Sequence, residues 1–514
     1  MIIKMKKYFK ILGVVSLLGL IVSCNKYLQK NPQDAYLISS SSYLITASDY
    51  QTMEVSVYTP LQWLNQLVPI GDIASDNAVS GGESASDVLD LQQIDDYTLT
   101  PVNGTLTNLW QYAYEGVNRA NYLTQYKTTN PSGQTVSFAG KEAMYGEVYF
   151  LRAFYYFTLV KMFGDVPLFT DKRLDISATG TLKRTAKASV YLSIENDLNA
   201  AINVLPNTQT QAGRATKFAA QALLGKVYLY QQKYDSAATV LQSVINSNAF
   251  SLVSNFASIF LKSGQNGPES VFEIQYSSSG ANSYDGADPA QGPGNYQVQQ
   301  CGVRNLSSSS SLMPYAPGWS TNLPTQNLAN AYSTGDQRKA ATCFDIVAYV
   351  AANPSWNITY QVAPYKNTGL YNQKYLPYIG QGATSGGDPK LNYPNNYRTI
   401  RYADVLLMAA EAYNKSASPN DAKAQLYLNQ VRRRAFQVND ASHDVTATGA
   451  ALYTAILNER RLELAMEGER FFDLVRTGQA ATVLSPLFKA GKNEVFPIPQ
   501  QEILVSGLAQ NPGY

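Results

Sequence analysis

One residue pattern occurs at two distant places in the chain, and it restricts the possible folds more than any other feature. The first copy reads Leu224-Gly225-x-x-Tyr228 followed by Ala237-x-x-x-Leu241, and the second reads Ala409-Ala410-x-x-Tyr413 followed by Ala422-x-x-x-Leu426. In both copies an alanine lies nine positions after the tyrosine. A small residue lets one helix approach its neighbour closely while the tyrosine packs into the pair. The pattern therefore predicts a pair of packed helices at each place.

This spacing is that of the tetratricopeptide repeat, a helix–turn–helix unit of about 34 residues. Further helices are expected over 106–127, 141–163, 188–204 and 449–467. The second of these is followed by Gly164 and then Pro167, a typical helix stop. We therefore predict a mainly α fold whose tetratricopeptide-like helical-repeat scaffold covers about 50–250 and 398–480.

The segment between these two parts, about 251–397, has a different composition. It is rich in Gly, Ser, Asn, Pro and Tyr, as in Ser277-Ser278-Ser279-Gly280. A single structureless loop of this length does not occur inside a compact protein. We therefore predict an inserted, loop-rich subdomain with short strands. Loops that a rigid scaffold holds in place often carry binding residues, so this is the expected ligand-binding region.

The N-terminus has the composition of an export signal. Lys4, Lys6, Lys7 and Lys10 precede an apolar run that is too short to span a bilayer. The run ends in Ser23-Cys24, which resembles a bacterial lipobox. This resemblance implies a signal peptide over 1–23, a lipid on Cys24 and a polar tether over 25–50. The alternative is an ordinary signal peptide with an incidental cysteine.

Charge and composition exclude several classes of function. The formal net charge is +2, but four of the 40 basic residues lie in the first ten positions, so the rest of the chain is close to neutral. A nearly neutral chain lacks the basic surface that nucleic acid binding requires. The 37 tyrosines, with their flat rings and polar tips, favour a neutral ligand.

Nothing in the sequence indicates a metal site or a cofactor. Cys301 and Cys343 are the two cysteines beyond the lipobox, and they either pair or remain free and buried. The single histidine, His443, lies in a polar loop next to Ser442 and Asp444, but a catalytic triad needs residues that converge in space. We therefore assign no catalytic, metal-ligating or cofactor-binding residue.

Several segments along the chain resemble the SusD-like (RagB/SusD) family. They include Gly146 to Tyr156 with Gly164 to Leu168, Arg401 to Glu411, Glu459 to Leu474, Phe496 to Pro499 and the terminal Gln510 to Tyr514. The resemblance covers the mature chain, 24–514. It implies a surface lipoprotein of the outer membrane that faces the cell exterior and works with a SusC-like TonB-dependent transporter. Its ligand would be an oligosaccharide or, less often, a peptide. The segment from Asn25 to Lys30 lacks the acidic residues that often follow the lipidated cysteine in exported lipoproteins of this kind.

The charged segment from Asn458 to Asp473 has two interpretations. Glu459, Glu463 and Glu467 recur every four residues and would share one helix face, where carboxylates can do acid–base work. The interpretation we favour is structural, with Arg460, Arg461 and Arg470 as donors to the carboxylates or to helix ends. Arg152, inside an apolar helix, is likewise expected to be buried against a carboxylate.

Ligand-binding residues are expected among rings in loops, because sugars present flat C–H faces on which aromatic rings stack. Tyr315 and Trp319 in the loop-rich region fit best. A second candidate is Trp63 with the early loop Asp72–Asn77, in which Asp76 and Asn77 would bind hydroxyls. Trp356 is a weaker candidate, and Trp110 is assigned to the core.

The sequence therefore favours a binding protein that captures nutrient oligomers, most often glycans, and delivers them to a transporter. Two alternatives stay open. A surface glycoside hydrolase would need two convergent carboxylates, which sequence cannot select. A helical-repeat scaffold that binds only other proteins would use its stacked helices as the contact surface.

Overall fold

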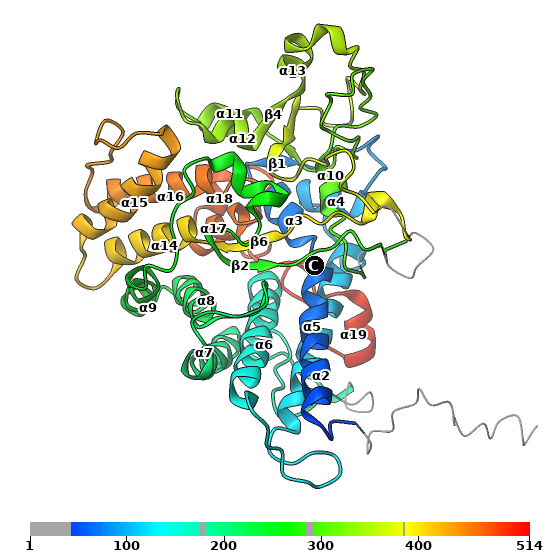
Figure 1. Ribbon diagram of the computed structural model, residues 1–514, viewed down its shortest axis with the longest axis vertical. Helices are drawn as coiled ribbons and strands as arrows, with labels where there is room; N and C mark the ends of the chain where they lie inside the picture. The colour runs from blue at the N-terminus through cyan, green and yellow to red at the C-terminus, as the bar shows by residue number, and fades with distance from the viewer. Residues whose placement is uncertain (1–42, 175–179, 281, 284–290, 384–385) are drawn as a thin grey trace, which may run out of the picture. The chain divides into compact units, whose positions relative to one another are not determined.

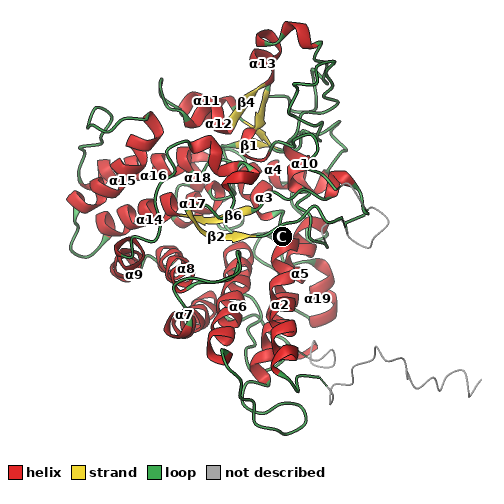
Figure 2. Cartoon of the chain, in the orientation of Figure 1, coloured by secondary structure: helices red, strands yellow, loops and turns green. Residues whose placement is uncertain are grey.

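The computed structural model describes residues 43–174, 180–280, 282–283, 291–383 and 386–514 (Figures 1 and 2). The predicted lipidation site Cys24, the signal segment and most of the predicted tether lie outside these ranges. The chain divides into two compact units. One contains 43–50 with 126–137, and the other contains 51–125 with the described residues from 138 onward.

The smaller unit is a short turn structure. Thr129 and Thr135 form an isolated antiparallel bridge. Between them the Asn130 side chain accepts hydrogen bonds from the backbone N–H groups of Ser132 (3.0 Å) and Gln134 (2.9 Å). An asparagine that bonds to the backbone two residues on is a common way to fix a tight turn.

The larger unit contains a row of packed helices, which we call the helical stack. Its members are α5 (Gly104–Gln125), α6 (Lys141–Phe163), α7 (Lys187–Val204), α8 (Lys217–Tyr230), α9 (Tyr234–Asn246), α14 (Tyr402–Lys415), α15 (Asp421–Phe436) and α16 (Gly449–Glu463). Each packs against the next in this order, so α9 packs directly on α14 although about 155 residues separate them (Figure 1). The predicted mainly α fold is confirmed.

The first copy of the repeated pattern forms the predicted helix pair, α8 and α9. A Cβ atom on Gly225 would lie 2.5 Å from Cδ2 of Leu241, so only glycine allows this approach. In the second copy, α14 and α15, the predicted register is wrong by two residues. Ala424 and Leu428 are fully buried, whereas Ala422 and Leu426 are exposed. The tyrosines of both copies are only half-buried.

Helix α6 lies at the centre of the apolar core. It ends at Gly164, whose φ of 73° is a left-handed conformation that favours glycine. As predicted, Arg152 on this helix is buried and pairs with a carboxylate, Asp197 on α7, through two bonds of 2.7 and 2.8 Å. Trp110 on α5 is 2% exposed and packs on Phe163, which confirms its place in the core.

Shorter elements complete the larger unit. Around the stack lie α2 (Ala47–Trp63), which begins in the smaller unit, and α3 (Leu67–Ile73), α4 (Leu89–Asp95), α17 (Arg470–Arg476), α18 (Ala480–Val483) and α19 (Gln500–Ser506). The loop-rich region contains η2 (Phe256–Phe260), η3 (Lys262–Gly264), α10 (Gln297–Cys301), α11 (Gln326–Ala331), α12 (Arg338–Thr342), α13 (Ile346–Ala352), η4 (Pro354–Trp356), η5 (Gln373–Tyr375) and η6 (Pro389–Leu391).

The strands are short and antiparallel, as predicted for the loop-rich region. They pair as β2 (Ser270–Ile274) with β6 (Tyr397–Arg401), β4 (Cys343–Asp345) with β5 (Leu370–Asn372) and β1 (Ala78–Val79) with β3 (Leu323–Pro324). Strand β1 lies well before residue 251, so an early part of the chain also contributes to this region. In the described ranges no helix is both long and apolar enough to cross a membrane.

Candidate functional site

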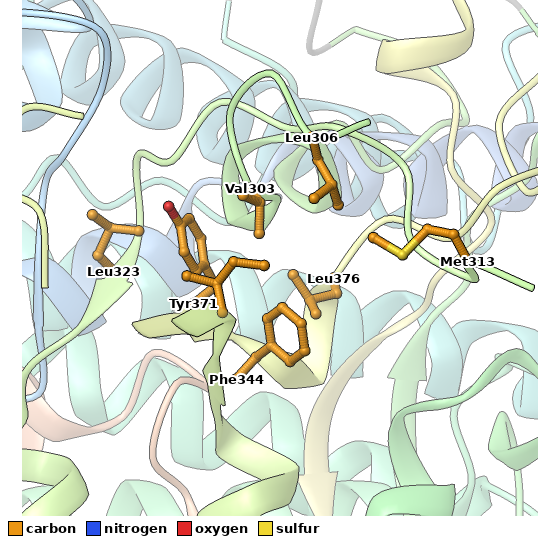
Figure 3. Close-up of a cluster of buried hydrophobic side chains, with 8 residues drawn as sticks. Val303, Leu306, Met313, Leu323, Phe344, Tyr371 and Leu376 are labelled. Carbon is orange, nitrogen blue, oxygen red and sulfur yellow. The ribbon is translucent and has the colours of Figure 1, made fainter. Parts of the chain in front are cut away.

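A small apolar core supports the outer part of the loop-rich region (Figure 3). It consists of Val303, Leu306, Met313, Leu323, Phe344, Ile346, Tyr371 and Leu376. Partly buried rings pack around it, among them Tyr315, Tyr349 and Trp356. The rings of this region are therefore mounted on a packed base even though regular structure is sparse.

Trp319 is held in place by backbone contacts. Its N–H donates to the Gln299 carbonyl (2.7 Å), and the following residue, Ser320, has a positive φ of 57°. Just before it the chain passes so close to Gly302 that a Cβ atom there would lie 2.7 Å from Cα of Gly318. This close crossing fixes the course of the backbone at Trp319. The Trp319 ring is half-buried and lies 6.4 Å from the Tyr296 ring.

Charged groups adjoin this pair of rings. The Arg304 guanidinium donates to the Trp319 carbonyl through Nε (3.2 Å) and Nη2 (3.0 Å). It also pairs with the carboxylates of Asp87 (2.7 Å) and Glu83 (3.3 Å), whose side chains are 31% and 71% exposed. Rings beside a planar donor and two accessible acceptors are the groups that a polyhydroxylated ligand needs. We call this set, Glu83, Asp87, Tyr296, Arg304 and Trp319, the Trp319 surface.

Tyr315 lies in a separate aromatic cluster. Its ring contacts Phe344 (5.0 Å), Tyr378 (5.2 Å) and Tyr349 (5.7 Å), and its hydroxyl accepts a bond from Gln373. Trp356 contacts the same cluster through Tyr349, 6.1 Å away. The side chains of Leu312 and Ile379 nearby are 72% and 61% exposed, so the cluster borders an apolar surface.

Trp63, at the end of α2, is half-buried between the edge of Tyr112 (5.5 Å) and the guanidinium of Arg119, which lies 5.2 Å above its ring. One ring face is therefore already occupied by an arginine. Among the described residues no contact joins Trp63 to the Trp319 surface. The structure thus does not bring the two predicted ligand candidates together.

The early loop does not have the predicted role. Asn77 is completely buried, and Asp76 forms ion pairs with Arg461 (2.9 Å) and Arg470 (2.8 Å). Both side chains hold two distant parts of the chain together, so neither is free to bind hydroxyls. Asp72 is also completely buried, where it accepts bonds from the backbone of Gly468 and from Asn322. Burial raises the pKa of Asp72 to about 7.

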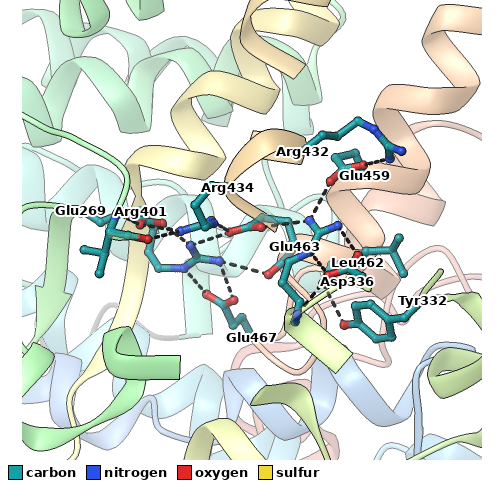
Figure 4. Close-up of polar contacts among 12 residues, drawn as sticks. Glu269, Tyr332, Asp336, Arg401, Arg432, Arg434, Glu459, Leu462, Glu463 and Glu467 are labelled. Atoms are coloured by element: carbon teal, nitrogen blue, oxygen red, sulfur yellow. Dashed lines mark hydrogen bonds and ion pairs between the residues drawn. The ribbon is translucent and has the colours of Figure 1, made fainter. Parts of the chain in front are cut away.

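The charged segment is structural, although its partners differ from those predicted. Figure 4 shows Arg401, Arg434 and their neighbours converging on Glu463. Arg401 pairs with Glu269 (2.6 Å), Glu463 (3.0 Å) and Glu467 (2.7 Å). The predicted donors bind elsewhere, since Arg460 pairs with Asp404 and Asp473 while Arg461 and Arg470 pair with Asp76. Helix α16 also ends at Glu463, so Glu467 lies beyond the shared face.

This buried network joins the loop-rich region to the helical stack. Arg338 on α12 pairs with Glu459 (2.7 Å) and Glu463 (3.1 Å) on α16, and Lys374 on η5 pairs with Glu467 (2.7 Å). Burial alone would raise the pKa of Glu463, but the surrounding arginines outweigh it and hold this pKa well below its usual range. A carboxylate that is always ionised and always paired is a poor acid or base.

The remaining candidates carry no chemistry in this arrangement. Cys301 and Cys343 are both buried and unpaired, and burial raises the pKa of the Cys343 thiol to about 12. His443 stacks 3.9 Å from Phe436, and Asp444 beside it is paired with Arg433. No cluster of three or more His, Cys, Asp or Glu side chains suitable for a metal ion occurs in the described part of the chain.

Sequence reasoning named Trp319 but missed the other four members of the Trp319 surface. More than 200 residues separate Arg304 from Glu83 and Asp87 in the chain. Gly302 and Gly318 were a usable signal, because glycines mark places where two backbones can approach closely, and Gly318 directly precedes Trp319. Tyr296 had no distinguishing signal among 37 tyrosines.

Comparison with known proteins gives matches over most of the chain. The family model described as "SusD family" matches residues 268–494, and the one described as "Starch-binding associating with outer membrane" matches residues 27–229. Among solved structures, a "Laminarin binding SusD-like protein" is 35% identical, covers 91% of this chain and 99% of its own, and has a TM-score of 0.80.

Two further relatives agree. Surface glycan-binding protein A from Bacteroides thetaiotaomicron, solved in complex with laminarihexaose, is 28% identical, with a TM-score of 0.78 over 90% of this chain and 99% of its own. SusD-like protein P2 from Formosa agariphila is 28% identical over 99% of this chain and its own full length. The likeness therefore extends through both the helical stack and the loop-rich region.

Proposed function

The chain belongs to the SusD-like family, and we propose that it binds an oligosaccharide at the Trp319 surface and delivers it to a TonB-dependent outer-membrane transporter. The observation that carries this proposal is the 35% identity, along nearly the whole chain, with a laminarin-binding SusD-like protein. The Trp319 surface supplies the matching chemistry in the loop-rich region. No bond needs to be made or broken for this function.

Binding at the Trp319 surface would use two kinds of contact. The half-buried rings of Trp319 and Tyr296 offer apolar faces on which the C–H face of a pyranose packs. Arg304 and the carboxylates of Asp87 and Glu83 offer donors and acceptors for hydroxyls. One guanidinium facing two carboxylates gives the surface no excess of positive charge, which favours a neutral glycan over an anionic one.

The cellular setting is also part of the proposal. We assign 1–23 to a signal peptide, Cys24 to a lipid anchor and 24–514 to one SusD-like domain whose ligand region is about 251–397. The description "associating with outer membrane" of the model that matches residues 27–229 supports this setting. The lipid, the outward orientation and the SusC-like partner remain proposals. Mass spectrometry of the mature N-terminus tests the anchor, and co-purification tests the transporter.

Calorimetry of the protein without residues 1–24 tests ligand binding. We expect laminarin or laminarihexaose to bind with a dissociation constant between micromolar and millimolar, about −8 to −4 kcal/mol. Trp319→Ala should weaken binding by about tenfold or more, equivalent to about 1.4 kcal/mol. Trp63→Ala is the matched control, because that ring is already covered by Arg119.

Three further measurements separate the alternatives. A peptide panel run beside the glycan panel distinguishes a peptide ligand from a sugar ligand. Release of reducing sugar would favour a glycoside hydrolase, and transporter binding without any glycan or peptide binding would favour a protein-binding scaffold. If Trp319→Ala and the native protein bind glycan equally well, the proposed surface is wrong even though the family assignment stands.

A further inference from the structure

A second cluster of carboxyl groups lies away from the Trp319 surface. Glu54 on α2 and Glu147 on α6 are 2% and 5% exposed, and both pair with the same guanidinium nitrogen, Nη1 of Arg214, at 2.8 and 3.1 Å. The two carboxyl groups are also within hydrogen-bonding reach of each other. Two buried carboxyl groups therefore share a single cation.

The hydrogen bonds show where a proton belongs. Glu147 is fully supplied with donors, since Oε1 accepts from Gln209 (3.0 Å) and Oε2 accepts from the Tyr58 hydroxyl (2.5 Å) as well as from Arg214. Glu54 receives Arg214 on Oε2, but its Oε1 is buried without a partner among the described residues. A buried oxygen without a donor is costly, above all when its carboxyl group is ionised, and protonation of Glu54 removes that charge. The hydrogen bonds therefore place the proton on Glu54.

Electrostatics agrees with this assignment. The charged and titratable groups at the cluster are Glu54 and Tyr58 from α2, Glu147 from α6 and Arg214 from the α7–α8 connection. Burial and the neighbouring Glu147 carboxylate raise the pKa of Glu54 to about 7, against the opposing effect of Arg214. With Glu54 protonated, the charges of Glu147 and Arg214 cancel. Without that proton, the buried cluster carries an uncompensated negative charge.

One connection covers the cluster. The segment 205–216 between α7 and α8 supplies Gln209 and Arg214, and the N–H of Ala215 donates to the Tyr58 hydroxyl (2.9 Å). Its outer residues Gln211 and Ala212 are exposed. Helix α6 is buried along most of its length and Glu54 lies on the buried face of α2, so lifting this segment would expose the two carboxyl groups to water.

The same segment separates two surface hollows. One, of about 230 Å³, lies between it and α2 and β2, with Gln62, Arg214 and Gln275 in its wall. The other, of about 240 Å³, lies on its far side and is lined by Asn207, Phe218 and Phe250. Residues 211–214 and Glu273 border both hollows. Glu273 is held in place by Asn266 and Asn396. Movement of 205–216 would therefore reshape both hollows together.

We propose that Glu54 and Glu147 share one proton and act as a pH-sensitive latch, which holds the 205–216 segment closed and releases it when the proton is lost. Below neutral pH the cluster is neutral and the segment is closed. Above neutral pH the second carboxylate must be hydrated, so the segment opens and the two hollows merge or widen. The device is independent of glycan binding at the Trp319 surface.

Hydrogen exchange of the full protein tests the latch. After correction for intrinsic pH dependence, exchange of the 205–216 amides should rise about tenfold from pH 6 to pH 8, because the protonated fraction falls from most molecules to few. Glu54→Gln keeps the shape of the side chain and cannot lose a proton. Corrected exchange of the 205–216 amides in this variant should therefore stay constant from pH 6 to pH 8. Glu147→Gln also removes one of the two carboxyl charges. It is a second variant whose exchange should not change with pH, for use if Glu54→Gln folds poorly.

A matched control uses a carboxyl group elsewhere. Burial raises the pKa of Asp95 to about 6, but Asp95 pairs with Lys366 and makes no contact with 205–216. Asp95→Asn should therefore keep the rise in exchange. No rise in the native protein, or an equal rise in native and Glu54→Gln proteins, would overturn the proposal.

Discussion

The helical stack and the loop-rich region are built on different principles. The stack buries apolar side chains from neighbouring helices, such as Val148, Leu151 and Leu241, at the spacing that helix packing requires. The loop-rich region buries many side-chain amides beside its small apolar core. The fully or almost fully buried amides are those of Asn282, Asn295, Gln297, Gln299, Gln300, Asn322, Asn372, Asn392, Asn395 and Asn396.

These amides replace the backbone ladders that the loop-rich region lacks. Asn392 is an example, because its side chain donates to the carbonyls of Asn282 (2.9 Å) and Asp388 (2.7 Å) and accepts from the Asn282 N–H (3.1 Å). Buried backbone groups without such partners would cost about 1–3 kcal/mol each. The comparison teaches that a repeated pattern specifies the stack, whereas individual side-chain bonds specify the loops.

The largest expected effect comes from cutting the ion network between the two regions. Arg401→Ala would leave Glu269, Glu463 and Glu467 buried without one of their cations. Removing one partner from a buried ion pair costs about 3–5 kcal/mol. We expect a loss of about 4 kcal/mol in the free energy of unfolding, measured by urea titration.

Lys233→Ala is the matched control for that change. Lys233 pairs with Glu195 at 2.6 Å, but its side chain is 44% exposed. Surface pairs contribute about 0–1 kcal/mol, so little stability should be lost. Similar losses for the two variants would show that the network does not hold the regions together.

The next largest effect tests the amide principle. Asn392→Ala removes three bonds to the backbone, two of them to the N–H and the carbonyl of Asn282. We expect a loss of about 3 kcal/mol and faster hydrogen exchange confined to 282–283, 291–295 and 386–396. If hydrogen exchange in this variant rises equally in the helical stack, the two regions unfold as one.

A pH experiment examines the buried acid that lies beside these amides. Asp72 has a pKa of about 7 in the folded protein, above its unfolded value of 3.8. The folded state thus binds more protons between these values, and its stability falls as pH rises from about 4 to 7. Asp72→Asn removes this fall. We expect it to match the native protein near pH 4 and to be more stable than the native protein at pH 8.

Asn322 makes this variant feasible. Its Nδ2 now donates to Asp72, while its Oδ1 is buried without a partner in the described structure. Rotating this amide by a half-turn would present the oxygen to the new side chain. A variant that is less stable than the native protein at every pH would contradict this account of Asp72.

The smallest effect concerns the close contact in the stack. Gly225→Ala would place a methyl group 2.5 Å from Cδ2 of Leu241. Alanine normally stabilises a helix by about 1 kcal/mol relative to glycine, but crowding of a packed core costs about 1–3 kcal/mol. We expect a net loss of about 1 kcal/mol in thermal or urea unfolding. Gly180→Ala, at an open position, should change stability by less than about 0.5 kcal/mol.

Much of the stack could be predicted because its signals are local. The C-terminal end of α6 follows from Gly164 and Pro167, and the α8–α9 contact follows from Gly225. The second copy of the pattern was placed correctly, but its register was wrong because Ala422 and Leu426 are as apolar as the buried Ala424 and Leu428. Local composition identifies a helix more reliably than it identifies the face that is buried.

The candidate site could be predicted only in part, since its polar partners are distant in sequence. Trp319 stood out as a tryptophan among glycines, but Arg304, Asp87 and Glu83 meet it only in the folded chain. Asp76 and Asn77 looked like surface residues because they are polar, but Asn77 is buried and Asp76 is paired, because Arg461 and Arg470 reach them from the far end of the chain. Contacts with residues so distant in the chain cannot be predicted from the local sequence.

The direct packing of α9 on α14 has a consequence for how such chains diversify. The peptide leaves the row of helices after Asn246 and returns at Tyr402, with β2 and β6 hydrogen-bonded near the point of exit and return. The excursion thus leaves and rejoins the row at helices that already touch, and the buried ion network holds its inner part against them. Its outer loops can therefore change in length or sequence while these attachments stay in place, so a new cargo specificity does not require a new body.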